Sequence, residues 1–98
     1  SPGVVIDTGA HLGDNNRLCA HCSLDHHSVV GSHNFFGPKC AISSIATVSD
    51  QCVFGLGVGI APLIRVGSGV QVTSGIVVAR SLPDDTYLSL PESEGCRV

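Results

Sequence analysis

Three consecutive polar residues, Asp25, His26 and His27, form the densest cluster of chemically active side chains in the sequence. Imidazole titrates near neutral pH, so a histidine is well suited to take a proton from an alcohol or amine that attacks a carbonyl group. A neighbouring carboxylate or second imidazole can hold such a base in one tautomer. The cluster therefore indicates acid–base chemistry; the alternative interpretation is that its three members are solvated residues of a turn.

Other histidines and cysteines have spacings that resemble fragments of metal sites. Cys19 and Cys22 have the C-x-x-C spacing of half a zinc site. The chain contains five cysteines, and no signal peptide is visible. An odd number of cysteines in such a chain favours reduced thiols and a cytoplasmic location. Whether these residues bind a metal depends on where the fold places them.

A six-residue period runs through nearly the whole chain. Every sixth residue from Ile6 to Val78 is Val, Ile, Leu or Phe, which gives thirteen anchor positions. The residue two places before an anchor, the slot position, is Ala, Asn, Cys or Ser from Ala10 to Cys52 and Val or Ile after it. Anchor and slot share one face of a strand because they are two residues apart. The period is typical of a parallel β-helix, in which each hexad supplies a short strand and a corner.

The repeat predicts an all-β chain of about four triangular coils over residues 1–81, with residues 82–98 as a C-terminal capping segment. Three hexads make one coil, so residues eighteen apart should stack. One predicted inward column consists of Leu24, Ile42, Ile60 and Val78. The chain begins in the middle of the pattern, and we expect that it is truncated or lacks a preceding domain.

This register separates the histidines and buries cysteines. Three histidines lie three residues after an anchor, on three sides of one coil: His21, His27 and His33. They cannot bind one metal ion within a single chain. Three cysteines share the inward slot, which predicts buried structural thiols: Cys22, Cys40 and Cys52. Cys96 is then the cysteine that we expect to react most readily.

Charge and hydropathy exclude several partners. A net charge of −3 with only five Lys and Arg argues against nucleic acid and anionic membranes. No run of eighteen apolar residues is present, so no transmembrane helix is expected.

Apolar residues do occupy outward positions just before the anchors: Val5, Val29, Phe35, Val53 and Val77. Such exposed side chains on a narrow column predict a homotrimer or, alternatively, contact with a missing domain.

The hexads resemble those of the hexapeptide-repeat acyltransferases, whose β-helix is left-handed. They are most similar to the sialic-acid and bacterial-sugar O-acetyltransferases (NeuD-like). The similarity lies in LCAHCSLDHHSVVGSHNFFGPKC at 18–40, VFGLGVGI at 53–60 and VVARSLPDD at 77–85. The resemblance implies an enzyme that moves an acetyl group from acetyl-CoA, its cosubstrate, to a hydroxyl or amine of a sugar or related small molecule, without a metal. It also implies a site between the subunits of a trimer.

In that resemblance the general base falls on His26, and Asp25 or His27 would orient it. The resemblance also suggests a place for the cosubstrate. Arg80, three coils beyond His26, would meet the CoA phosphates. The pantetheine arm would approach the backbone beside a Gly-rich coil: Gly55, Gly57 and Gly59.

Two other interpretations remain open. The γ-class carbonic anhydrases share this helix and bind zinc with histidines from two chains of a trimer, and His21 and His26 have the His-x₄-His spacing of that class. The other interpretation is a non-catalytic trimeric scaffold.

Overall fold

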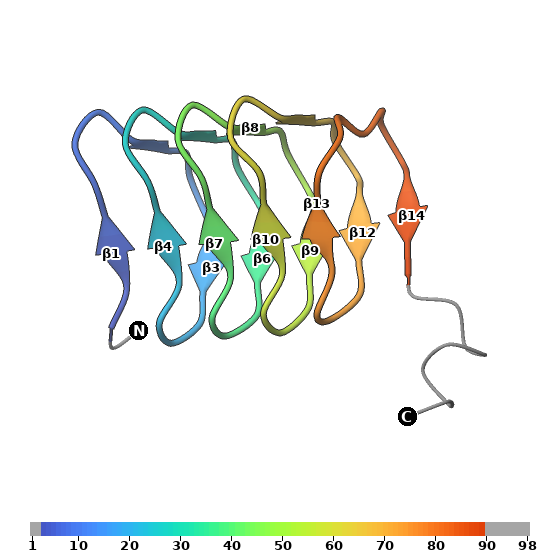
Figure 1. The fold of residues 1–98 in the computed structure, drawn as a ribbon, viewed down its shortest axis with the longest axis horizontal. Coiled ribbons are helices and arrows are strands. Elements are labelled where there is room, and N and C mark those ends of the chain that lie inside the picture. The colour runs from blue at the N-terminus through green and yellow to red at the C-terminus, as the bar shows by residue number, and fades with distance from the viewer. Residues whose placement is uncertain (1–2, 90–98) are drawn as a thin grey trace.

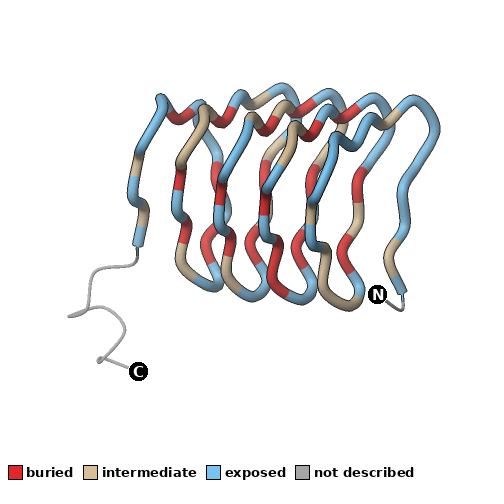
Figure 2. Tube along the Cα trace, turned by 180° about the vertical axis from the view of Figure 1, so that it is seen from behind, coloured by how far each residue is buried: buried red, intermediate tan, exposed pale blue. Residues whose placement is uncertain are grey.

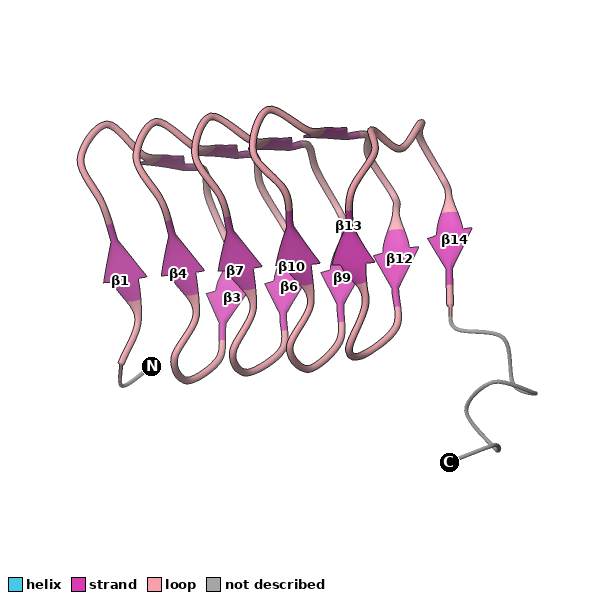
Figure 3. Cartoon of the chain, in the orientation of Figure 1, coloured by secondary structure: helices cyan, strands magenta, loops and turns pink. Residues whose placement is uncertain are grey.

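A computed structural model describes residues 3–89 and shows a left-handed β-helix with a triangular cross-section (Figure 1). Strands of two residues alternate with corners, and no helix occurs within residues 3–89 (Figure 3). This part of the chain therefore has no helix that could cross a membrane. The predicted all-β coil is confirmed.

Every third strand lies on the same face, and the strands of each face pair in parallel. Sheet A contains β1 (Val5–Ile6), β4 (Ser23–Leu24), β7 (Ala41–Ile42), β10 (Gly59–Ile60) and β13 (Val77–Val78). Sheet B contains β2 (His11–Leu12), β5 (Val29–Val30), β8 (Thr47–Val48) and β11 (Arg65–Val66). Sheet C contains β3 (Arg17–Leu18), β6 (Phe35–Phe36), β9 (Val53–Phe54), β12 (Gln71–Val72) and β14 (Tyr87–Leu88).

The register is the predicted one, with paired residues eighteen apart. Leu24 pairs with Ile42, and Ile60 pairs with Val78. The anchors from Leu24 to Val78 are at most 3% exposed, and buried residues recur along the successive coils (Figure 2). Ile6 and Leu12 also face inward but are more exposed, because they belong to the first layer that the structure describes.

The coil continues for two strand positions beyond Val78, where the six-residue count ends. Leu82 pairs with Val66, and β14 pairs with β12, so the offset falls from eighteen to sixteen residues. The corner at 79–81 has three residues between anchors, whereas the other corners have five. Residues 82–89 thus complete a fifth layer, and the rest of the predicted capping segment, 90–98, lies outside the described residues.

Polar side chains in the slot positions tie successive layers together. Asn34 accepts the N–H of Cys52 at 2.8 Å and donates to the carbonyl of Ser49 at 2.8 Å. The thiols of Cys22 and Cys40 likewise donate to carbonyls fifteen residues further on, each at 3.1 Å. The slot therefore favours a small side chain that can donate a hydrogen bond, which explains why cysteine recurs there.

These interior thiols should resist modification in the native protein. Burial raises the pKa of the Cys40 thiol from 9.0 to about 11, against a smaller lowering by the hydrogen bond from the Val58 backbone. Burial also raises the pKa of Cys52. Because the thiolate is the reactive form, we expect an alkylating reagent near pH 8 to label half-buried Cys19 before Cys40 and Cys52. Mass spectrometry of partially labelled protein tests this, and early labelling of Cys40 would contradict the register; Cys96 lies outside the described residues.

Candidate active site

His26 and His27 occupy the corner between β4 of sheet A and β5 of sheet B. Asp25, directly after the anchor Leu24, closes this corner. Its Oδ1 accepts the N–H of His26 at 3.0 Å, and its carbonyl accepts the N–H of Ser28 at 3.2 Å and the Ser28 hydroxyl at 2.8 Å. The Asp25 carboxylate therefore shapes the backbone of the corner through the His26 N–H.

The layer before the corner positions His27. Its φ of 59° lies in the left-handed region, as φ does at the equivalent position of the other five-residue corners. The N–H of His27 donates to the carbonyl of Thr8 at 3.1 Å. Its ring covers Gly9, where an added Cβ would lie 2.6 Å from Cδ2 of the imidazole. Glycine at this position leaves room for the ring to lie over the preceding layer.

The two imidazoles contact each other through their Nδ1 atoms, which are 3.2 Å apart. The ring centroids are 5.4 Å apart and the planes meet at 81°. Such a contact needs one protonated and one unprotonated nitrogen. When Nδ1 of His26 donates to Nδ1 of His27, the lone pair of His26 lies on Nε2. In that arrangement the contact with His27 fixes the tautomer of His26 that a general base requires, whereas Asp25 contacts the backbone N–H of His26.

The predicted glycines lie along sheet A and its far corner, away from His26. Gly55 follows β9, and an added Cβ there would lie 2.5 Å from the Ser74 hydroxyl, so this glycine allows two layers to approach. Gly57 has a φ of 69° at the corner between sheets C and A, with open space around it. Gly59 lies in β10. Sheet A therefore separates the open Gly57 corner from the His26 corner, and the role of the glycines in binding a pantetheine arm stays a prediction.

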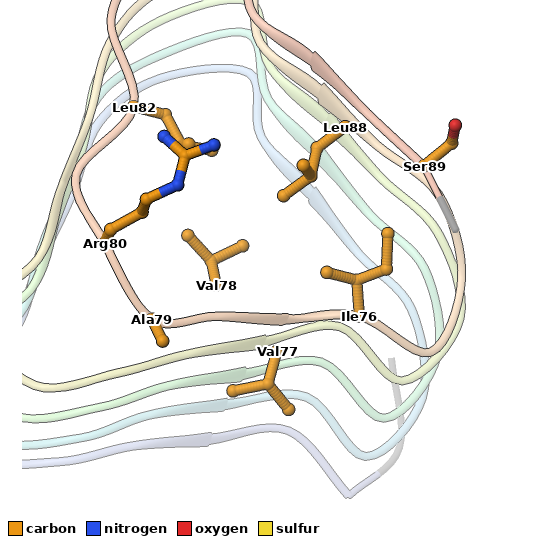
Figure 4. A pocket seen from close by; sticks show the side chains of 8 residues that line it. All are labelled: Ile76, Val77, Val78, Ala79, Arg80, Leu82, Leu88 and Ser89. Carbon is orange, nitrogen blue, oxygen red and sulfur yellow. The ribbon is translucent and has the colours of Figure 1, made fainter. Parts of the chain in front are cut away.

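Arg80 lies on the same corner as His26, three layers further along the coil. Because that corner is two residues short, its chain path differs from the path around His26. Arg80 lines a cavity of about 440 Å³ at the end of the coil (Figure 4), together with Ile76, Leu82 and Leu88. The structure does not bring Arg80 and His26 together, and a contact between Arg80 and the CoA phosphates stays a prediction.

The histidines with the carbonic-anhydrase spacing lie at different corners of one coil. His21 is at the corner between sheets C and A, whereas His26 is at the corner between sheets A and B. Within residues 3–89, no group of three metal-ligating side chains comes together.

Sequence reasoning also missed a second cavity, which lies around Arg65 on the outer face of sheet B. Its only signal in the sequence is that polar Thr47 and Arg65 occupy outward positions eighteen residues apart.

Comparisons with known proteins agree with the predicted resemblance to acyltransferases and confirm the fold. No family model matches the chain. The chain is similar to the UDP-3-O-acylglucosamine N-acyltransferase of Methylobacterium nodulans, with 26% identity over 83 residues that cover 81% of this chain and 24% of that protein.

Two solved structures have the same fold. PerB from Caulobacter crescentus, in complex with CoA and GDP-perosamine, superposes with a TM-score of 0.69 and 22% identity over 92% of this chain and 53% of that one. The acetyltransferase domain of PglB from Neisseria gonorrhoeae, in complex with acetyl coenzyme A, gives a TM-score of 0.75 and 17% identity over 91% and 52%. The chain therefore spans about half the length of these neighbours and about a quarter of the curated relative.

Proposed function

We propose that the protein transfers an acetyl group from acetyl-CoA to a hydroxyl or amine of a sugar, with His26 as the general base. The observation that carries the proposal is the contact between Nδ1 of His26 and Nδ1 of His27. When Nδ1 of His26 is the donor, this contact leaves the lone pair on Nε2, where it can accept a proton. The proposal is also supported by structural neighbours that hold CoA and a nucleotide-linked sugar, or acetyl coenzyme A.

In the proposed reaction, Nε2 of His26 takes the proton of the acceptor O–H or N–H as that atom attacks the thioester carbonyl. The new bond to carbon forms, the carbon–sulfur bond breaks, and the proton passes from His26 to the departing CoA sulfur. The transient imidazolium keeps its Nδ1–H, so it can continue to donate to His27. Asp25 holds the corner in shape through the N–H of His26.

The apolar outward residues support a site between subunits of a homotrimer. Val5 and Val77 on sheet A are 60% and 70% exposed, and Phe35 lies beside Val53 on sheet C. Exposed apolar patches on so narrow a column favour burial against further copies of the chain. His26 is exposed at a corner, where a second chain can close a cleft around it.

The trimer prediction has a direct physical readout. Light scattering of the purified chain should give three times its 10.0 kDa mass, because three copies can cover the apolar outward positions of one another. A stable monomer across the accessible concentration range would contradict the proposed assembly.

A turnover assay tests the proposed reaction itself. Acetyl-CoA is supplied with a panel of nucleotide-linked amino sugars and free hydroxyl sugars, and release of the CoA thiol is followed together with the mass of the acceptor. We expect thiol release that depends on the acceptor and an acceptor mass increased by one acetyl group. Absence of both turnover and acetyl-CoA binding would favour the scaffold. Stoichiometric zinc together with CO₂ hydration would favour the carbonic anhydrase interpretation.

A further inference from the structure

A groove of about 420 Å³ lies on the outer face of sheet B, between its third and fifth layers. The half nearer the His26 corner is formed by Thr47, Arg65 and Ser81. Thr47 and Arg65 are paired neighbours on β8 and β11, and Ser81 lies on the following layer, where its Oγ accepts the Arg65 N–H at 3.0 Å. These three residues, here called the Arg65 column, stack along the axis of the coil.

The Arg65 column offers hydrogen-bond donors that suit a phosphate group. Arg65 is the only cationic side chain that lines the groove, and its guanidinium can form two parallel hydrogen bonds to phosphate oxygens. The Ser81 hydroxyl accepts from the backbone and therefore still has its own proton to donate. Thr47 contributes a second hydroxyl on the other side of Arg65. Fewer polar groups surround Arg80, whose cavity is lined mainly by apolar side chains.

The distance from His26 suits the length of a nucleotide cosubstrate. The corner of His26 leads into β5, and β11 lies two layers further along sheet B. Two layers correspond to roughly 10 Å along the axis. An extended pantetheine arm is about as long as four residues of extended chain, roughly 14 Å. A ligand whose thioester lies at His26 can therefore place its diphosphate beside the Arg65 column.

We propose that the groove on sheet B binds the phosphate groups of a nucleotide-linked substrate through the Arg65 column. The ligand is the diphosphate of CoA or of a nucleotide-linked sugar, and this inference rests on the proposed acetyl transfer.

Asp84 lines the other half of the groove, where its Oδ1 accepts the N–H of Ser68 at 2.8 Å. Its charge opposes a nearby phosphate, so Asp84→Asn, which keeps an oxygen acceptor, should strengthen phosphate binding about two- to fivefold.

Calorimetry on the full chain tests the proposal with four probes: CoA, S-acetyl-pantetheine, a UDP-linked amino sugar and inorganic diphosphate. Arg65→Gln should weaken binding of the phosphate-bearing ligand by about tenfold, because a charge-assisted hydrogen bond is lost. Binding of S-acetyl-pantetheine, which has no phosphate, should not change. Arg17→Gln is the matched control, since Arg17 occupies the same outward position on β3 of sheet C and is also exposed.

The probes separate the sources of the phosphate and the two proposals. Weaker binding of CoA alone assigns the groove to the cosubstrate, whereas weaker binding of the UDP-linked sugar alone assigns it to the acceptor. If Arg65→Gln binds both CoA and the UDP-linked sugar as tightly as the wild type does, the groove is overturned but acetyl transfer is left intact. Diphosphate binding that requires Arg65, without binding of CoA or sugar, upholds the groove and overturns the proposed function. No binding of any probe overturns both.

Discussion

Replacing His26 with Asn is expected to lower the rate of acetyl transfer by about 10²–10⁴-fold, the usual contribution of a positioned general base. Asn fills a similar position at the corner but cannot accept a proton at neutral pH. The affinity for acetyl-CoA should stay within about twofold, because the proposed role of His26 concerns the moving proton and not the binding of the cosubstrate. Steady-state turnover and calorimetry on the same preparations measure the two quantities.

Two further histidine variants make the prediction specific. His33→Asn changes a histidine of the same coil at another corner, where Nδ1 contacts Asn15 at 2.9 Å, and it should leave turnover unchanged. His27→Asn is well tolerated by the backbone, since Asn readily adopts the left-handed conformation. It should lower turnover by about tenfold and alter the pH profile, because His26 loses the contact that selects its tautomer. Equal turnover in His26→Asn and the wild type would remove His26 from the mechanism.

The hexad pattern was sufficient to predict the register because one side chain per strand must fill a narrow prism. Phe35 and Phe36 are identical in type, and only the period distinguishes them, yet Phe36 is fully buried and Phe35 is exposed. The same period placed Cys22, Cys40 and Cys52 inside the coil. Side chains that face the interior depend only on their position in the repeat, so counting along the chain is enough to locate them.

The remaining features depend on contacts that a count along the chain does not contain. The corner at 79–81 is two residues short, so the six-residue count misses Leu82 and Leu88, the anchors that complete the fifth layer. Whether Asp25 or His27 contacts the His26 ring depends on backbone hydrogen bonds at the corner, where the N–H of His26 donates to the Asp25 carboxylate. The residues of the Arg65 column come from three successive layers, and one of them lies in the shortened corner. No motif within a single stretch of sequence shows that they lie side by side.

Replacing Phe36 with Ala should have one of the two largest effects on stability of any single truncation in sheet C, together with truncation of Phe54. Phe36 and Phe54 are both fully buried, and their rings stack with centroids 4.9 Å apart and planes 11° from parallel. Removing one ring leaves a cavity between layers and deprives the other ring of its partner. Because a coil of two-residue strands has little freedom to close the cavity, we expect a loss of about 3–5 kcal/mol in the free energy of unfolding. Denaturant unfolding followed by circular dichroism measures this loss.

Phe35→Ala is the control, since it removes the same ring from the adjacent position on the outside of β6. If Phe35 contacts another subunit, its effect on unfolding should vary with protein concentration, because association contributes to stability by mass action. The effect of Phe36→Ala should be the same at every concentration, because its contacts lie within one chain. A loss below about 1 kcal/mol for Phe36→Ala, or an equal and concentration-independent loss for both variants, would show that the hexad register does not determine which phenylalanine supports the fold.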